Sequence, residues 1–303
     1  MVEKKGLGKA IGHAFLWLGI AIVLFPLYIA LVATTHTFDV LIGSTPLWFG
    51  GEFLKNFTTV LTQGLKAAGG IPVWVMMANS LVMALGIAIG KIAISITAAY
   101  AIVYFRFPGR ELCFVLIFIT LMMPVEVRIV PTFQVAANLN FIDSYLGLVL
   151  PLIASATATF LYRQMFMTIP AELLEAARID GAGPWRFFVD VVLPLSRTNT
   201  AALFVVLFIY GWNQYLWPLL VTNQESMYTI VMGIQRMVNI PDAVPEWNLI
   251  MAVALLGMLP PPAGGARYAE AFRPWPRGNR KISPPKGYQH GTRPAQERRK
   301  DFQ

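Results

Sequence analysis

Residues 170–194 hold charged and small side chains at close spacing between two strongly apolar stretches. The segment begins Pro170-Ala-Glu-Leu-Leu-Glu-Ala-Ala-Arg-Ile-Asp-Gly-Ala-Gly and ends on Leu193 and Pro194. A chain this apolar is expected to keep the loops between membrane spans short, so a polar segment of this length is expected to serve something outside the bilayer. We expect that it serves another protein.

The segment also carries a group of apolar side chains that is large for a solvated loop: Leu173, Leu174, Ala177, Trp185, Phe187 and Phe188. Two interpretations remain open for this surface. It binds a partner protein, or it packs against the chain's own spans.

Catalytic and metal chemistry are not predicted. The single Cys113 lies in an apolar stretch and three histidines are scattered, so no cluster has the spacing of metal ligands. Gly86-Ile-Ala-Ile-Gly90-Lys91 resembles a phosphate-binding loop, but it is one residue short, lacks the Ser or Thr and follows no strand. The spacing of Gly86 and Gly90 instead predicts a close contact between helices.

Three ionisable residues, Lys91, Glu126 and Arg128, lie inside stretches that are otherwise apolar. Such groups cost about 2.5–3.5 kcal/mol within a membrane and usually face a bundle interior or water. Lys91 and Glu126 are therefore candidates for lining a substrate pathway, in which Lys91 would attract an anionic phosphate. Other interpretations stay open: Glu126 and Arg128 pair with each other or lie near the outer interface, and Lys91 snorkels or bonds to a neighbouring helix.

Aromatic and amide side chains gather between residues 210 and 217. Tyr210, Asn213 and Gln214 are candidates for lining the same pathway, because stacking faces and hydrogen-bonding groups together bind sugars and polyols. An aromatic belt at the membrane surface is an equally good explanation of Tyr215 and Trp217.

Composition defines the class of protein that must position these residues. The chain is 56% hydrophobic and 13% charged with a mean hydropathy of +0.58, against about one quarter charged residues in soluble domains. A bilayer core requires roughly 20 apolar helical residues. Stretches of that length run near residues 11–34, 79–105, 112–137, 144–166 and 198–221, and a sixth begins at Trp247 and stops early.

The distribution of lysine and arginine predicts the orientation. The first apolar stretch is longer than the 7–15 residues or so of a signal-peptide core, so it is interpreted as an uncleaved anchor. We place the amino terminus, residues 1–10, in the cytoplasm. Of the Lys and Arg residues that flank the spans, only Lys55, Lys66 and Arg236 then lie on the extracytoplasmic side. The cations placed inside are Lys4, Lys5, Lys9, Arg106, Arg110, Arg163, Arg178, Arg186 and Arg197. Segment 170–194 is therefore expected to face the cytoplasm.

Two short helices are predicted within segment 170–194. Pro170 suits the start of a helix of about two to three turns, and Gly181 offers the flexible stop that helices often use. Pro184 is expected to start a second helix, which ends where Pro194 interrupts it.

These residues resemble a known family. Glu175-Ala176-Ala177, Asp180-Gly181-Ala182, Phe188 and Val192-Leu193-Pro194 are similar, with the same spacing, to the EAA loop of binding-protein-dependent ABC importer permeases. Further similarity to the carbohydrate-uptake permeases related to the maltose system lies in Asn79-Ser80-Leu81, Pro124-Val-Glu126 and Gly211-Trp-Asn-Gln-Tyr-Leu-Trp-Pro218.

The resemblance covers residues 10–260 and implies an all-α polytopic membrane protein. The expected architecture is the six-helix ABC importer permease, with residues 11–260 as the transmembrane domain and the sixth helix cut short.

The resemblance also implies a role: the permease subunit of an ATP-driven solute importer, forming half of the translocation pathway in the bacterial inner membrane. Expected partners are a second permease subunit, a cytoplasmic ATPase dimer, an extracytoplasmic solute-binding protein and membrane lipid, with no nucleic acid. ATP and magnesium are expected on the ATPase subunits, so this chain is expected to bind no cofactor and to be no enzyme by itself.

Segment 170–194 would be the coupling helix, seated in a cleft of the ATPase. The residues that the resemblance assigns to coupling are Glu175, Ala176, Ala177, Asp180, Gly181, Leu193 and Pro194. Glu175 would make polar contacts, the two alanines would allow close approach, and Gly181 would permit a turn that a side chain obstructs.

The likeness favours sn-glycerol-3-phosphate as the solute, with a neutral sugar or polyol as the alternative. A secondary transporter would also have five or six spans and buried charges. That class typically shows internal repeats and paired broken helices, and no convincing repeat is evident. A membrane enzyme would need a catalytic cluster.

The end of the chain departs from the family. Residues 249–259 begin a span but make only about 17 Å of helix, roughly half of what a bilayer needs, and three prolines follow at 260–262. Residues 261–303 are rich in Pro, Gly and Arg, a composition that predicts disorder. A frameshift in a GC-rich gene is the preferred hypothesis for this tail. A basic segment that binds anionic lipid and a naturally divergent end are the alternatives.

Overall fold

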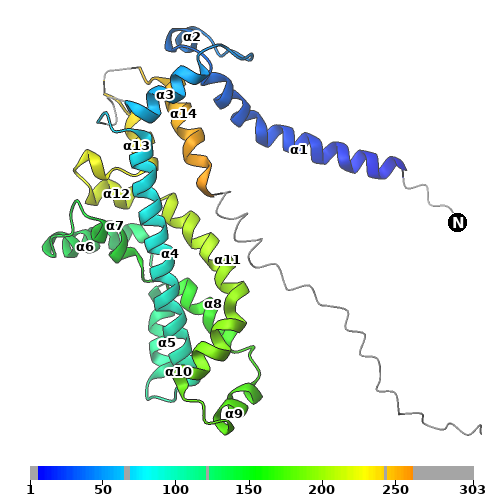
Figure 1. Ribbon diagram of the computed structural model, residues 1–303, viewed down its shortest axis with the longest axis vertical. Helices are drawn as coiled ribbons and strands as arrows, with labels where there is room; N and C mark the ends of the chain where they lie inside the picture. The colour runs from blue at the N-terminus through cyan, green and yellow to red at the C-terminus, as the bar shows by residue number, and fades with distance from the viewer. Residues whose placement is uncertain (1–5, 65–68, 121–122, 242–243, 262–303) are drawn as a thin grey trace, which may run out of the picture. The chain divides into compact units, whose positions relative to one another are not determined.

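The computed structural model describes residues 6–64, 69–120, 123–241 and 244–261 (Figure 1). All secondary-structure elements in these ranges are helices, in agreement with the predicted all-α class. The tail at 262–303, which carries the predicted disorder and the frameshift hypothesis, lies outside the described residues.

Three helical stretches are long and apolar enough to cross a membrane. They are α1 (Gly6–Ala33), α4 (Val73–Tyr104), and the continuous run of α10 (Pro184–Phe187), η4 (Phe188–Val192) and α11 (Leu193–Trp212). A fourth span results if two helical segments that meet at a 48° bend are counted together. The first segment consists of α7 (Tyr145–Val149) and η3 (Leu150–Leu152), and the second is α8 (Ala156–Phe166). The predicted membrane class is confirmed.

Shorter helices connect these stretches. They are α2 (Phe38–Gly43), α3 (Phe53–Thr62), α5 (Arg110–Ile119), α6 (Val125–Asn138), α9 (Ala171–Ile179), α12 (Leu216–Val221), η5 (Glu225–Met227), α13 (Ile230–Val238) and α14 (Trp247–Met258). With 12 residues, α14 is too short by itself to cross a bilayer, as the sequence predicts for the sixth span.

Two predicted spans are broken. The stretch 112–137 forms two helices, α5 and α6, because Pro124 precedes α6 and cannot supply an N–H to a continuous helix. The stretch 198–221 belongs to a helix that starts earlier and ends at Trp212, and α12 follows after residues 213–215.

The predicted helix end at Pro194 is wrong, since α10, η4 and α11 run on as one span from Pro184 to Trp212. The reason is the π-helical turn at Phe188–Val192, directly before Leu193. A proline clashes with the carbonyl four residues earlier in a regular α-helix, and the wider π turn accommodates Pro194 without ending the helix.

Helix α4 is the centre of the packing. It lies against both α11 and α8 (Figure 1), and its glycines permit the close approach that the sequence predicts. A Cβ added at Gly86 would lie 2.9 Å from the side chain of Val149, and one at Gly90 would lie 2.5 Å from Ile153.

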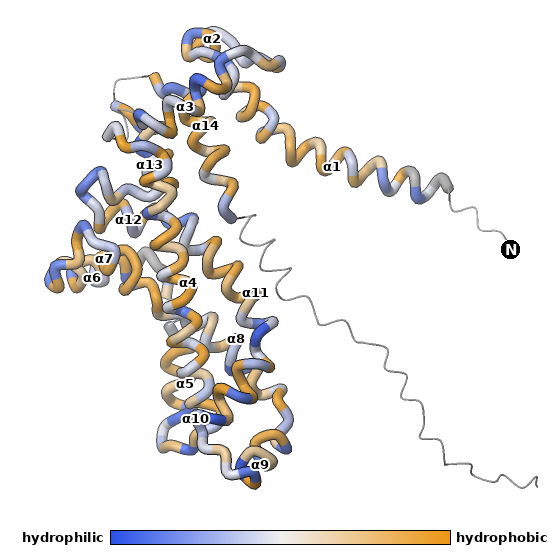
Figure 2. The backbone as a smooth tube through the Cα atoms, in the orientation of Figure 1, coloured by the Kyte–Doolittle hydropathy of each residue, from blue (hydrophilic) through white to orange (hydrophobic). Residues whose placement is uncertain are grey.

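By contrast, α1 exposes large apolar side chains along its length, which suits contact with lipid or with another spanning helix (Figure 2).

A buried amide near the start of α4 ties two distant segments to it. Asn79 donates through Nδ2 to the carbonyls of Ser226 (2.8 Å) and Tyr228 (3.0 Å). It also accepts from the Tyr145 hydroxyl at 2.7 Å. Since an unpaired buried polar group costs about 1–3 kcal/mol, these bonds hold α7 and the loop before α13 in place around α4.

Candidate functional site

Helix α9 has the start and stop that the sequence predicts. Pro170 is the residue before its first turn, and Gly181 ends it with φ +72°, in the left-handed region. Gly181 N donates to Arg178 O at 3.1 Å and Ala182 N donates to Ala177 O at 2.8 Å. This pair of bonds is the Schellman motif, which satisfies carbonyls at a helix end and requires a left-handed residue there.

The apolar side chains of segment 170–194 divide between the two predicted interpretations. Phe187 and Phe188 are buried in a cluster with α4 and α8, and Leu174 packs against the same cluster. Trp185 and Ile179 instead expose 72% and 86% of their surface. One part of the segment thus packs against the spans, and the other part is exposed.

The polar residues of α9 are open as well. Glu175, Arg178 and Asp180 are exposed, and among the described residues none of them forms a side-chain hydrogen bond or ion pair. Ala176 is exposed beside them, whereas Ala177 is half-buried. At the far end of the segment, Leu193 is half-buried and Pro194 is exposed.

Two tyrosines of α4 connect this segment to the membrane spans. The Tyr100 hydroxyl donates to the carbonyl of Pro184 at 2.6 Å, and its ring lies 4.8 Å from that of Phe188. The ring of Tyr104 meets Phe187 edge to face at 5.3 Å. Neither tyrosine was predicted as a functional residue, although their spacing of four residues on one helix face, at the end of an apolar stretch, was an available signal.

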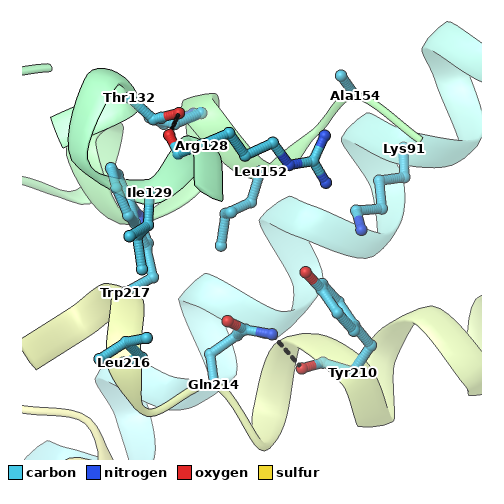
Figure 3. A pocket seen from close by; sticks show the side chains of 11 residues that line it. Lys91, Arg128, Ile129, Thr132, Leu152, Ala154, Tyr210, Gln214, Leu216 and Trp217 are labelled. Carbon is cyan, nitrogen blue, oxygen red and sulfur yellow. Dashed lines mark hydrogen bonds between the residues drawn. The ribbon is translucent and has the colours of Figure 1, made fainter. Parts of the chain in front are cut away.

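A second candidate site is a cavity of about 140 Å³ midway along α4 (Figure 3). Its polar lining comes from three helices and the residues after them: Lys91 on α4, Arg128 and Thr132 on α6, and Tyr210 and Gln214 at the end of α11. Leu152, Leu216 and Trp217 are among its apolar walls.

Lys91 is 93% buried, since only 7% of its surface is exposed. Its ammonium lies 3.8 Å from the centroid of the Tyr210 ring, a cation–π contact between α4 and α11. Figure 3 shows the Arg128 guanidinium and the Tyr210 hydroxyl pointing into the same space. Within the described part of the chain, no carboxylate forms an ion pair with Lys91 or Arg128.

Of the other predicted pathway residues, only Gln214 is among the described residues that line the cavity. Glu126 is in the first turn of α6, and its side chain lies outside what the structure describes. Asn213 is exposed at the end of α11 and is not part of the cavity lining. Gln214 does line the cavity and donates to Tyr210 O at 3.2 Å. Trp217 is buried and donates to Gly147 O at 3.0 Å, so it packs inside the protein rather than in an aromatic belt.

The fold and these two sites define a polytopic helical membrane permease. Residues 91–261 match the family of binding-protein-dependent transport system inner membrane components, and the chain belongs to that family. It is 52% identical to the sn-glycerol-3-phosphate transport system permease protein UgpE of Rhizobium meliloti, over 87% of this chain and 94% of that protein. It is 54% identical to the proteins of the same name from Agrobacterium fabrum and Salmonella choleraesuis, in each case over 86% of this chain and 93% of the relative.

A solved structure has the same fold. It is the crystal structure of a bacterial ABC transporter involved in the import of the acidic polysaccharide alginate. The alignment covers 90% of this chain and 99% of that one, with a TM-score of 0.75 and 17% sequence identity. This shared fold and the family match together confirm the predicted ABC importer permease architecture.

Proposed function

We propose that this chain is one of two permease subunits of an ATP-driven importer of sn-glycerol-3-phosphate. The observation that carries the proposal is the identity of 52–54% over 93–94% of relatives that are named for transport of this solute. The cationic cavity midway along α4 supports an anionic solute over a neutral sugar or polyol, the alternative.

In the proposed mechanism, segment 170–194 docks in a cleft of a cytoplasmic ATPase dimer, which holds the ATP and magnesium. Support comes from the exposed Ile179 and Trp185 and from Glu175, Arg178 and Asp180, which are exposed and form no side-chain bond with any residue that the structure describes. Because Phe187 and Phe188 pack against Tyr100 and Tyr104, a displacement of the segment moves α4 with it as a rigid body. The amino terminus lies in the cytoplasm on this proposal, supported by the excess of Lys and Arg on that side.

A second permease subunit completes the pathway. The cavity of about 140 Å³ is smaller than the roughly 300–1,000 Å³ of sites that enclose a small molecule, which suits a half-site closed by another chain. A solute-binding protein delivers the solute from the opposite side of the membrane.

Transport by the assembled complex tests the proposal. The two permease subunits and the ATPase are reconstituted in proteoliposomes with ATP on the ATPase side, and the cognate solute-binding protein is added on the other side. We expect ATP-dependent accumulation of radiolabelled sn-glycerol-3-phosphate that excess unlabelled glycerol does not inhibit. Accumulation of a neutral sugar or polyol, with none of sn-glycerol-3-phosphate, would contradict the proposed substrate.

A further inference from the structure

We infer that Lys91, Arg128 and Tyr210 form a subsite that holds the phosphate group of the solute during translocation. The inference rests on the proposed function and adds to it the residues of this subunit that contact the anion. A binding role for this permease follows, beyond shaping one wall of the pathway.

The first support is a charge imbalance. Two cationic side chains face one cavity inside an apolar helix bundle, and the described residues that line this cavity include no carboxylate. Burial removes hydration from the Lys91 ammonium, and the like charge of Arg128 across the cavity repels it. A phosphate group between them would compensate both charges, so the arrangement suits an anion that enters and leaves.

The second support is the geometry of the donors. Arg128 presents a planar fork that matches two phosphate oxygens, whereas the Lys91 ammonium is a compact charge with three donors. The Tyr210 ring holds the ammonium at 3.8 Å, and its hydroxyl points into the same space (Figure 3). Donors on α4, α6 and α11 thus face the same part of the cavity, where one phosphate group could accept from all three.

Neighbouring groups suit the polyol part of the solute. The Gln214 Nε2 donates to Tyr210 O, which leaves its Oε1 to accept from a hydroxyl. Leu152 and Leu216 offer apolar contact for the carbon chain. The cavity therefore has a cationic side for a phosphate and a mixed side for a short polyol.

The position of Lys91 along α4 suits an intermediate binding site on the translocation pathway. At about 1.5 Å per residue, Lys91 lies roughly 18 Å from Asn79, near one end of the helix, and roughly 14 Å from Tyr100, near the coupling segment. Arg128 is exposed rather than fixed by packing, so its guanidinium is free to close on an arriving anion.

The test compares solute uptake with ATP hydrolysis in the same proteoliposomes, at saturating solute-loaded binding protein. In Lys91→Met and in Arg128→Gln, we expect uptake of sn-glycerol-3-phosphate to fall by about ten- to a hundredfold, the usual effect of losing a hydrogen bond to a charged group. ATP hydrolysis should stay within about twofold of wild type, so the ATP used per solute rises. Lys91→Arg, which keeps the charge, should retain most of the uptake.

Lys55→Met and Arg197→Gln are matched controls. Lys55 is paired with Glu52 on the surface, and Arg197 is exposed on α11 away from the cavity, so both variants should transport as wild type does. Normal uptake in Lys91→Met and Arg128→Gln would overturn the inference. An equal loss of uptake and ATP hydrolysis would also overturn it, because that result indicates a structural or coupling role.

A binding measurement separates this inference from the proposed function. The purified complex without binding protein should broaden the ³¹P resonance of sn-glycerol-3-phosphate, and Lys91→Met and Arg128→Gln should abolish the broadening. Suppose that wild type does not transport this solute, while wild type broadens the resonance and the two variants do not. That result contradicts the proposed substrate and supports the anion subsite. If wild type transports it and the variants broaden the signal as wild type does, the subsite fails alone.

Discussion

Gly181→Val is expected to abolish ATP-driven uptake while the chain still inserts in the membrane in normal amounts. Gly181 has φ +72°, a region that costs an ordinary residue about 1–2 kcal/mol and is least tolerant of β-branched side chains. The Schellman turn would be lost, and the exposed face of α9 would point elsewhere. Uptake by proteoliposomes, set against the amount of protein in the membrane, measures the effect.

Gly181→Asn is the matched control, because asparagine tolerates the left-handed region far better than valine. Apart from its two chain neighbours, no heavy atom of the described chain lies within 4 Å of a Cβ added at this position, so the two variants are expected to differ through the backbone conformation. We expect the asparagine variant to retain a substantial share of uptake. If Gly181→Val takes up solute at the wild-type rate, the turn is not needed for coupling.

Ile179→Asp is expected to release the ATPase from the complex. Ile179 is 86% exposed at the last turn of α9, and apolar anchors at the centre of an interface cost at least about 2 kcal/mol when removed. A carboxylate buried there without a partner adds a desolvation penalty. Co-purification of the ATPase with tagged permease should therefore fall by at least about tenfold.

Leu54→Asp provides the comparison for that variant. Leu54 is 74% exposed on α3, in the loop that the proposed orientation places on the opposite side of the membrane. The same change of charge there should leave the ATPase bound. Equal loss of ATPase in both variants would indicate general destabilisation and remove the support for docking through α9.

The local chemistry of segment 170–194 could be predicted because it depends on neighbouring residues alone. Pro170 and Gly181 mark the ends of α9 through backbone preferences that act over one turn. The end predicted at Pro194 was wrong for a related reason: a π turn at Phe188–Val192 has no reliable local signature, and it removes the clash on which the prediction depended.

The cavity could be predicted only in part. Lys91 and Arg128 were each visible as charges in apolar stretches, but 37 positions separate them, and the sequence offered Glu126 as a nearer partner for Arg128. What brings them together is the break at Pro124, which makes α6 a separate helix, and the packing of α6 against α12, the helix after α11. The break is a local effect of proline, whereas the packing is tertiary. Asn213 illustrates the converse, because it directly follows the last residue of α11 and is exposed outside the cavity lining.

Site-specific crosslinking tests the central claim, that segment 170–194 contacts an ATPase, most directly. Ala176→Cys is placed in a Cys113→Ser background, since Cys113 is exposed and would react as well. Ala176 is itself exposed on α9. With a short thiol-to-amine reagent and the assembled, transporting complex, the account predicts an adduct to the ATPase subunit that mass spectrometry maps to Ala176→Cys. Adducts confined to the solute-binding protein or to the second permease subunit would contradict it.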